Sequence, residues 1–230
     1  MNRRTRNGLA TVGASVAVAA LLTGCGTASA QTLDATDSAR AAAAAQALLN
    51  AAKAPTVKLL GANGEGCPNT KSIAVTNLKS GFFTIRFTKL SARVGPKVNA
   101  KERRRACTVS LRVSTDQGLT YGIKSVRVDG VAGVAKGARA QADVTAAGQP
   151  AVTGAFTKAL KGPVKGAYSG TGSLAPPVRG DCGAPTRALT LTSAVATNRG
   201  SSSAKATTTL NLMPSKTKAG LTVKLVNLVC

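Results

Sequence analysis

The sequence predicts an all-β fold, an antiparallel β-sandwich of about eight to ten short strands. Three observations support this fold class. Apolar and polar residues alternate with a period of two, turns rich in Gly, Pro and Asp separate the alternating segments, and no helical period of useful length follows Pro55. Strands with one buried and one solvated face alternate in this way. The alternating segments are 83–87, 108–114, 122–128, 139–145, 189–195, 207–212 and 221–229, and the predicted turns include 115–118, 129–130, 175–177 and 198–201.

Residues 1–24 have the pattern of a signal peptide. Arg3, Arg4 and Arg6 precede a small, apolar run over 8–22. This run is too short to span a bilayer comfortably, because a transmembrane helix needs about 20 apolar residues. We therefore expect the chain to be exported, with no membrane-spanning segment in the mature protein.

Two processing signals overlap at the end of this peptide. Residues 22–25, Leu-Thr-Gly-Cys, resemble a bacterial lipobox, in which Cys25 receives a diacylglycerol and cleavage falls before it. Residues 28–30, Ala-Ser-Ala, resemble an ordinary signal-peptidase site with cleavage after Ala30. We favour lipidation of Cys25 because the apolar run ends close to the lipobox, and two acyl chains give stable attachment. The predicted location is the outer face of the bacterial cell membrane, and the alternative is a released, extracellular protein.

Residues 25–60 are predicted to form an alanine-rich tether. Asp37 or Ser38 can cap a helix, five consecutive alanines follow Arg40, and Pro55 ends the run, so a short helix over 38–53 is plausible. An isolated helix of about 15 residues is marginal in water. A spacer helix and an unstructured linker both fit this segment, and the β-sandwich domain is predicted to follow over 61–230.

Four cysteines remain in the domain: Cys67, Cys107, Cys182 and Cys230. An exported chain with an even number of thiols normally oxidises them, and four cysteines allow three pairings. We favour Cys67–Cys107 and Cys182–Cys230, since each pair crosslinks one half of the domain and contributes about 4 kcal/mol in the chain-entropy model. A metal site is disfavoured because the spacing is far from C-x-x-C and the chain has no histidine. We predict no cofactor.

The order of short motifs resembles a known family. Gly-Cys-Pro opens the domain at 66–68, a cysteine-led strand follows at 107–113, Asp-Cys-Gly lies at 181–183, and Cys230 ends the chain. This pattern is similar to the small secreted bacterial proteins grouped as domain of unknown function 4360, over about residues 64–230. The resemblance implies secretion and a β-rich domain, and it implies no established activity or catalytic residue.

The charge of the chain is strongly positive. It has 31 Lys and Arg against 8 Asp and Glu, a net charge of +23. Such a field attracts polyanions and is screened by salt. Nucleic acid is disfavoured as a partner by the extracellular location and by the scarcity of aromatic stacking platforms. We therefore expect contact with anionic envelope polymers, and the alternative is a highly charged soluble surface without a partner. The sequence does not indicate an oligomeric state, and a monomer is the default expectation.

The basic residues singled out as possible polyanion contacts form two groups. One group precedes Cys107, and the other occupies a predicted loop rich in Gly and Pro. The first comprises Lys101, Arg103, Arg104 and Arg105, and the second comprises Lys158, Lys161 and Lys165.

Catalysis has little support in the sequence. The absence of histidine excludes Ser-His-Asp and Cys-His chemistry. A carboxylate pair requires two acids side by side in a cleft, whereas the acids of the domain lie mostly at predicted turns. They are Glu65, Glu102, Asp116, Asp129, Asp143 and Asp181. We predict a non-enzymatic envelope protein of unknown role, and the alternative is a secreted hydrolase with an unidentified carboxylate site.

Overall fold

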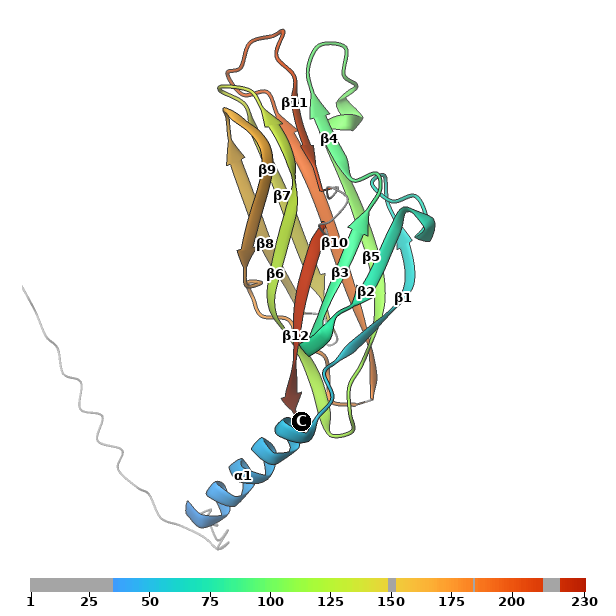
Figure 1. Ribbon diagram of the computed structural model, residues 1–230, viewed down its shortest axis with the longest axis vertical. Helices are drawn as coiled ribbons and strands as arrows, with labels where there is room; N and C mark the ends of the chain where they lie inside the picture. The colour runs from blue at the N-terminus through green and yellow to red at the C-terminus, as the bar shows by residue number, and fades with distance from the viewer. Residues whose placement is uncertain (1–34, 149–151, 184, 213–219) are drawn as a thin grey trace, which may run out of the picture.

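The computed structural model describes residues 35–148, 152–183, 185–212 and 220–230 (Figure 1). These residues form twelve strands, one α-helix and three short 3₁₀ helices. The strands build two antiparallel sheets that face each other. The prediction of an all-β sandwich is therefore confirmed. The predicted signal peptide, the lipobox and Cys25 lie outside the described residues.

The five-stranded sheet has the order β1-β5-β10-β7-β8. Its strands are β1 (Thr56–Asn63), β5 (Arg104–Ser114), β10 (Thr186–Asn198), β7 (Arg139–Ala147) and β8 (Thr153–Lys161). The seven-stranded sheet has the order β2-β3-β12-β6-β11-β4, and β9 pairs with β6 beside this path. Its strands are β2 (Ile73–Asn77), β3 (Phe82–Phe87), β12 (Leu221–Val229), β6 (Leu119–Val134), β11 (Thr208–Asn211), β4 (Ser91–Val94) and β9 (Val164–Gly172). The 3₁₀ helices are η1 (Thr70–Ser72), η2 (Lys79–Gly81) and η3 (Ala100–Arg103).

The hydrophobic core lies between the sheets and consists mainly of Val, Leu and Ala side chains. The apolar positions of the alternating segments supply it, as the period of two requires. Leu111 and Leu189 from one sheet and Ile85 and Leu221 from the other are fully buried. Tyr121 is the largest side chain that is fully buried among the described residues.

The first strand begins earlier than the predicted domain boundary. β1 starts at Thr56, within the stretch 25–60 assigned to the tether. Val57 is buried in the core, and the Asn77 side chain both donates to and accepts from its backbone, at 2.8 Å in each case. These contacts with β2, together with the ladder to β5, make residues 56–60 part of the sheet.

The predicted turn at 129–130 is wrong, because both residues lie within the long strand β6. Gly130 serves close packing instead of a turn. A Cβ atom at this position would lie 2.0 Å from the Asn211 carbonyl oxygen and 2.7 Å from the Tyr168 ring. Asp129 is 7% exposed and accepts hydrogen bonds from Arg127, the shortest at 2.9 Å.

The loop predicted around the second lysine group is also wrong. Lys158 and Lys161 lie on β8, and Lys165 lies on β9. The glycines of β9 explain why a segment of low strand propensity pairs here. A Cβ atom on Gly170 would lie 2.8 Å from Lys158, and one on Gly172 would lie 2.5 Å from Phe156, so glycine leaves room for side chains of β8. Tertiary packing thus overrides local propensity.

Helix α1 (Ala35–Ala51) projects from one end of the sandwich, beside the C-terminus (Figure 1). The chain that follows it is fixed by two hydrogen bonds. The Lys53 amide donates to Asp116 Oδ2 at 2.8 Å, and Asn227 Nδ2 donates to the Lys53 carbonyl at 2.9 Å. Within the described part of the chain, no helix is long and apolar enough to cross a membrane.

The sandwich therefore has two distinct ends. The proximal end is where α1, Cys230 and the turn at 115–118 lie, and the distal end is where β5 and β7 begin and β8 and β10 end. β10 runs between the ends with 13 residues, a length of about 40 Å.

Candidate anion-binding surface

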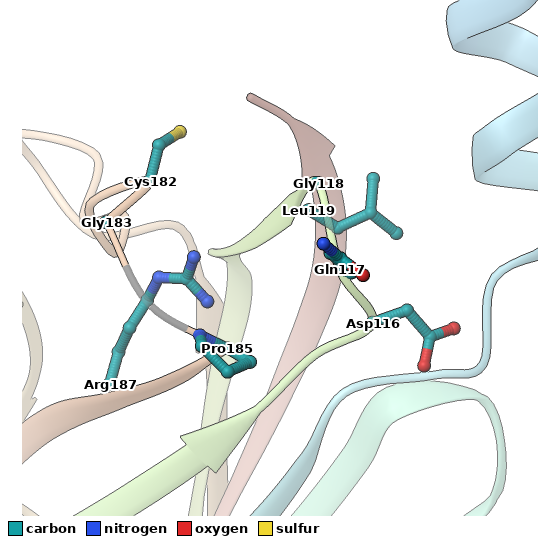
Figure 2. Close-up of a pocket in the computed structure, with 8 residues that line it drawn as sticks. All are labelled: Asp116, Gln117, Gly118, Leu119, Cys182, Gly183, Pro185 and Arg187. Carbon is teal, nitrogen blue, oxygen red and sulfur yellow. The ribbon is translucent and has the colours of Figure 1, made fainter.

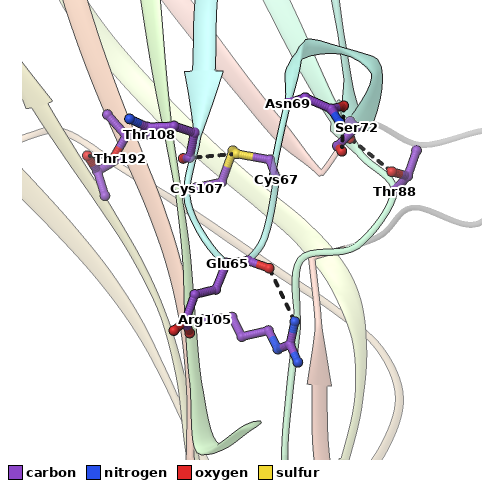
Figure 3. Close-up of a disulfide and its surroundings, with 10 residues drawn as sticks. Glu65, Cys67, Asn69, Ser72, Thr88, Arg105, Cys107, Thr108 and Thr192 are labelled. Atoms are coloured by element: carbon purple, nitrogen blue, oxygen red, sulfur yellow. Dashed lines mark hydrogen bonds between the residues drawn. A yellow bond between two sulfur atoms is a disulfide. The ribbon is translucent and has the colours of Figure 1, made fainter. Parts of the chain in front are cut away.

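Each half of the domain contains one disulfide, and the two differ in exposure. Cys67 and Cys107 are both 0% exposed, and their disulfide joins the turn after β1 to β5 (Figure 3). The Cys182–Cys230 disulfide lies at the proximal end with both residues exposed. There the Cys230 amide also donates to the Gly118 carbonyl at 3.0 Å. The last strand is thus fixed at its very end. This is the pairing that the sequence favoured.

A pocket of about 390 Å³ lies beside the exposed disulfide. We call it the proximal pocket, and Figure 2 shows the side chains that line it. They are Asp116, Gln117, Gly118, Leu119, Cys182, Gly183, Pro185 and Arg187.

The charge in the proximal pocket is neutralised from within. Arg187 is only 4% exposed, and its guanidinium donates to Thr115 Oγ1 at 2.9 Å and to the Asp181 carbonyl oxygen. The Asp181 carboxylate lies 3.4 Å from Arg187 Nε. Loss of either partner of such a pair would leave an uncompensated charge, and the pair itself leaves little net charge for a ligand.

Tyr121 packs behind this pair. Burial raises the pKa of its hydroxyl to about 12, and the opposing influences of Arg187, which lowers the pKa, and Asp181, which raises it, are smaller. The hydroxyl donates to the Ala188 carbonyl at 3.1 Å. The proximal end is therefore a well-connected structural site.

The distal end presents four exposed cations and one half-buried cation, which we together call the distal basic arc. The exposed ones are Arg103, Arg104, Arg139 and Lys161, and the half-buried one is Arg199. Sheet register brings these residues together. Asn198 lies opposite Arg139, and Arg139 lies opposite Lys161. Arg103 and Arg199 line the same cavity of about 230 Å³, together with Asn198. Arg104 lies opposite Ala196 on β10, so the arc crosses about 15 Å from β5 to β8.

Few acids compensate the distal basic arc. Glu102 is the acid of the adjoining helix η3, and its carboxylate forms an ion pair with Arg93, which is outside the arc. The hydrogen bond from Arg93 holds the pKa of Glu102 below its ordinary value. None of the three ion pairs formed by the described residues includes a member of the arc. The arc therefore keeps its positive charge available to solvent.

The structure brings together only part of the predicted basic set. Arg103, Arg104 and Lys161 belong to the distal basic arc, and Lys101 lies beside them in η3. Arg105 instead donates to the Glu65 carbonyl at 3.2 Å, next to the buried disulfide (Figure 3).

Two of the predicted lysines have other surroundings, and two arginines were missed. Lys158 packs against Gly170, and Lys165 lies opposite Gly133 of β6. Arg139 and Arg199 were not predicted as contacts. No local signal identifies them, because the register of β7 with β10 places Arg139 between the two basic groups of the sequence, and Arg199, just after β10, lines a cavity with Arg103.

The acids of the domain mostly have structural partners. Asp143 accepts from Thr157 Oγ1 at 2.7 Å, and Asp116, Asp129 and Asp181 have the partners described above. Within residues 35–230, apart from the undescribed gaps, no group of three or more His, Cys, Asp or Glu side chains is placed to hold a metal ion.

Comparisons with known proteins give one family. The family model described as "Domain of unknown function (DUF4360)" matches residues 53–227, which confirms the resemblance drawn from the cysteines and strand motifs. The comparison with curated proteins gave no match. Among solved structures, the chain is similar to the enzymatically active domain of tailspike protein 4 of bacteriophage CBA120, with 11% identity, covering 76% of this chain and 19% of that chain. The TM-score of 0.23 is too low for this similarity to carry an argument.

Proposed function

This chain belongs to the family of domain of unknown function DUF4360, and we propose that it is an exported, lipid-anchored, non-enzymatic cell-envelope protein whose basic β-domain contacts anionic surface polymers. The observation that carries the proposal is the position of the distal basic arc. Its exposed cations lie at the end of the sandwich opposite to α1. A domain that is attached to the membrane through its N-terminal anchor would present this end away from the membrane.

Distance favours polymers over the lipid headgroups of the anchoring membrane. The sandwich is about 40 Å long between its ends, and α1 with 17 residues adds up to about 25 Å. Electrostatic attraction in physiological salt decays over about 8 Å. The distal basic arc therefore acts on anions that reach it from the surrounding envelope.

Export and anchoring rest on the sequence, with support from the crosslinks. Removing residues 1–24 leaves 28 basic and 8 acidic side chains, so the mature chain keeps a net charge of +20. Two disulfides suit an oxidising compartment. The proposed anchor is the diacylglycerol on Cys25, and a chain released after Ala30 is the alternative form.

Retention on isolated anionic cell-wall material tests the polymer contact. The mature protein is applied at low salt and eluted with a salt gradient, beside a variant in which all five residues of the distal basic arc are Gln. A control removes the same amount of charge elsewhere, through Gln at Lys71, Lys79, Arg86, Lys124 and Arg179. We expect the arc variant to lose retention at least ~10-fold and the control to lose far less. Equal losses, or retention of the wild type that salt does not weaken, would contradict the proposal.

The intact mass of the protein from its native host tests the anchor. Lipidation predicts a chain that begins at Cys25 with added diacylglycerol, and release predicts a chain that begins at Gln31. A chain that still begins at Met1 would remove both export routes.

A further inference from the structure

Two pairs of cations lie directly opposite each other in the five-stranded sheet. Lys58 of β1 faces Arg112 of β5, and Arg139 of β7 faces Lys161 of β8. All four residues are exposed, and none takes part in the three ion pairs of the described residues. Like charges in directly opposite positions destabilise a sheet. A bound anion would relieve that repulsion at both places.

Both pairs lie on the same face of the sheet. Arg112 is opposite Ala188 on β10, and Arg139 is opposite Asn198 on the same strand. Because 188 and 198 are both even positions, their side chains leave the strand on one side. Leu189 leaves on the other side and is fully buried. Ten residues of strand separate the pairs, so they mark two ends of one outer face about 35 Å apart.

The surface between the pairs carries hydroxyl and methyl groups on β5 and β10, and Gln141 and Asp143 on β7. Thr192 lies in a row with Thr108 on one side and Thr145 on the other, and Thr190 lies opposite Ser110. Figure 3 shows Thr108 and Thr192 beside each other, and their Oγ1 atoms are 3.0 Å apart. The next even positions of β10, 194 and 196, are alanines. Small side chains keep this stretch flat, and the hydroxyls can both donate and accept hydrogen bonds.

The charged residues of this sheet are almost all positive. Its five strands contain eight Lys and Arg residues and one acid, Asp143. Asp143 accepts from Thr157 at 2.7 Å and from Gln141 at 2.8 Å, so hydrogen bonds within the protein occupy both carboxylate oxygens. The five strands contain one aromatic residue, Phe156, which contacts β9 instead of the outer face.

We propose that this outer face binds a linear polymer of polyol phosphate, with phosphates at both cation pairs and polyol hydroxyls along the Thr and Ser rows between them. The inference rests on the proposed function and names the surface and the ligand chemistry. Arginine binds phosphate oxygens through its planar fork of N–H donors. Sugar rings are commonly recognised by aromatic stacking, and this face offers hydroxyls where a ring-binding surface would offer aromatic side chains. An acyclic chain of phosphates and hydroxyls fits it better.

The geometry predicts a dependence on polymer length. A short oligomer reaches only one cation pair, whereas a chain longer than about 35 Å reaches both, and the second contact then forms within one complex. We expect long chains to bind at least ~10-fold more tightly than short chains at equal concentration of phosphate.

Glycerol phosphate oligomers of two lengths, about 15 Å and about 45 Å, test the inference by calorimetry with the full mature protein. The first variant is Lys58→Gln with Arg112→Gln, which removes the proximal pair and leaves the distal basic arc intact. It should lose the advantage of the long oligomer and bind the short one nearly as the wild type does. Asp143→Asn is the matched opposite change, because it removes the acid of this face and keeps hydrogen-bonding groups. It should strengthen binding of the long oligomer by about 2- to 5-fold.

The outcomes separate this inference from the proposed function. If the Lys58/Arg112 variant binds the long oligomer as tightly as the wild type, while the arc variant loses binding, the extended face is wrong and the polymer contact remains. If the wild type binds neither oligomer, and wall material does not retain it either, the proposed function fails as well. Equal binding of polygalacturonate of the same length would overturn the choice of phosphate.

Discussion

The two ends of the sandwich differ in which groups are buried, the cations or the disulfide. At the proximal end the cation is buried, since Arg187 is 4% exposed and lies beside Asp181, while the disulfide is on the surface. Towards the distal end the disulfide of Cys67 is fully buried, and four of the five cations of the distal basic arc are exposed. This difference indicates that the buried cation of the proximal pocket, Arg187, serves the fold and that the charge of the distal basic arc is available to another molecule. Five predictions can break or sharpen the comparison.

The largest difference is expected in the rate of disulfide reduction under native conditions. A thiolate can attack the exposed Cys182–Cys230 bond directly, whereas Cys67–Cys107 reacts only after the surrounding structure opens. Opening the core of a domain of ordinary stability makes the buried bond at least ~10²-fold slower. Alkylation followed by peptide mass analysis, over a time course in mild dithiol, measures both rates. Simultaneous reduction of the two bonds would show that the ends do not differ in this way.

The next effect compares one arginine from each end. Arg187→Ala removes buried hydrogen bonds to Thr115 and to the Asp181 backbone and leaves polar groups unpaired, so we expect a loss of about 2–3 kcal/mol in unfolding free energy. Arg139→Gln removes an exposed cation that faces Lys161, and its effect should stay within about 0.5 kcal/mol. Urea unfolding of both variants checks this. A larger loss for Arg139→Gln would mean that distal charge also serves the fold.

Two buried tyrosines give a smaller contrast that also depends on pH. The Tyr121 hydroxyl donates to the Ala188 carbonyl, whereas no hydrogen-bond partner of the Tyr168 hydroxyl is present among the described residues. Tyr121→Phe should therefore cost about 1 kcal/mol and Tyr168→Phe close to nothing. Thermal unfolding at pH 7 distinguishes them. Equal costs would show that the Tyr168 hydroxyl is as well bonded as that of Tyr121.

The pH dependence of stability follows from the same burial. Burial raises the pKa of Tyr121 to about 12 from its ordinary value of 10, and burial also raises the pKa of Tyr168. Between pH 10 and about 12 the folded state keeps protons that the unfolded state releases, so the unfolding free energy falls as pH rises through this window. Replacing either tyrosine with Phe should make the fall less steep. A wild-type unfolding free energy that stays constant from pH 9 to 12 would contradict this.

The smallest effect is the response of stability to salt. Repulsion within the distal basic arc weakens as salt screens it. The melting temperature of the wild type should therefore rise by about 2–4 °C between low and high sodium chloride, and the arc variant should rise less. A charge-matched variant with Gln at Lys71, Lys79, Arg86, Lys124 and Arg179 is the control. Equal rises in all three proteins would assign the repulsion to net charge instead of the arc.

The sequence predicted the fold class because its strongest strands carry a clear physical signal. Segments such as 107–113 alternate buried and exposed side chains and contain β-branched residues. β8 and β9 lack this signal, since Gly, Ala and Lys dominate them, and their pairing depends on packing between strands. Gly130 shows the same limit, because glycine signals a turn as readily as a close approach of two strands.

The distal basic arc was only half predictable for a related reason. Arg103 and Arg104 belong to one basic group of the sequence and Lys161 to another, so all three could be chosen from local charge density. Arg139 joins them through the register of β7 with β10 and β8, and Arg199 joins them because it directly follows the end of β10. Register between strands distant in sequence depends on the whole sheet, so charge clusters built across strands are invisible to a local reading.

The slope of binding affinity against salt concentration tests the central claim most directly. The mature protein, the arc variant and the charge-matched control are titrated with one anionic wall polymer over a range of sodium chloride concentrations. We predict a steep slope for the wild type, a similar slope for the control, and a much shallower slope for the arc variant. Each cation–anion contact releases counterions when the complex forms, so a variant with fewer contacts releases fewer of them. Identical slopes for the arc variant and the control would contradict the claim that the distal end is the contact surface.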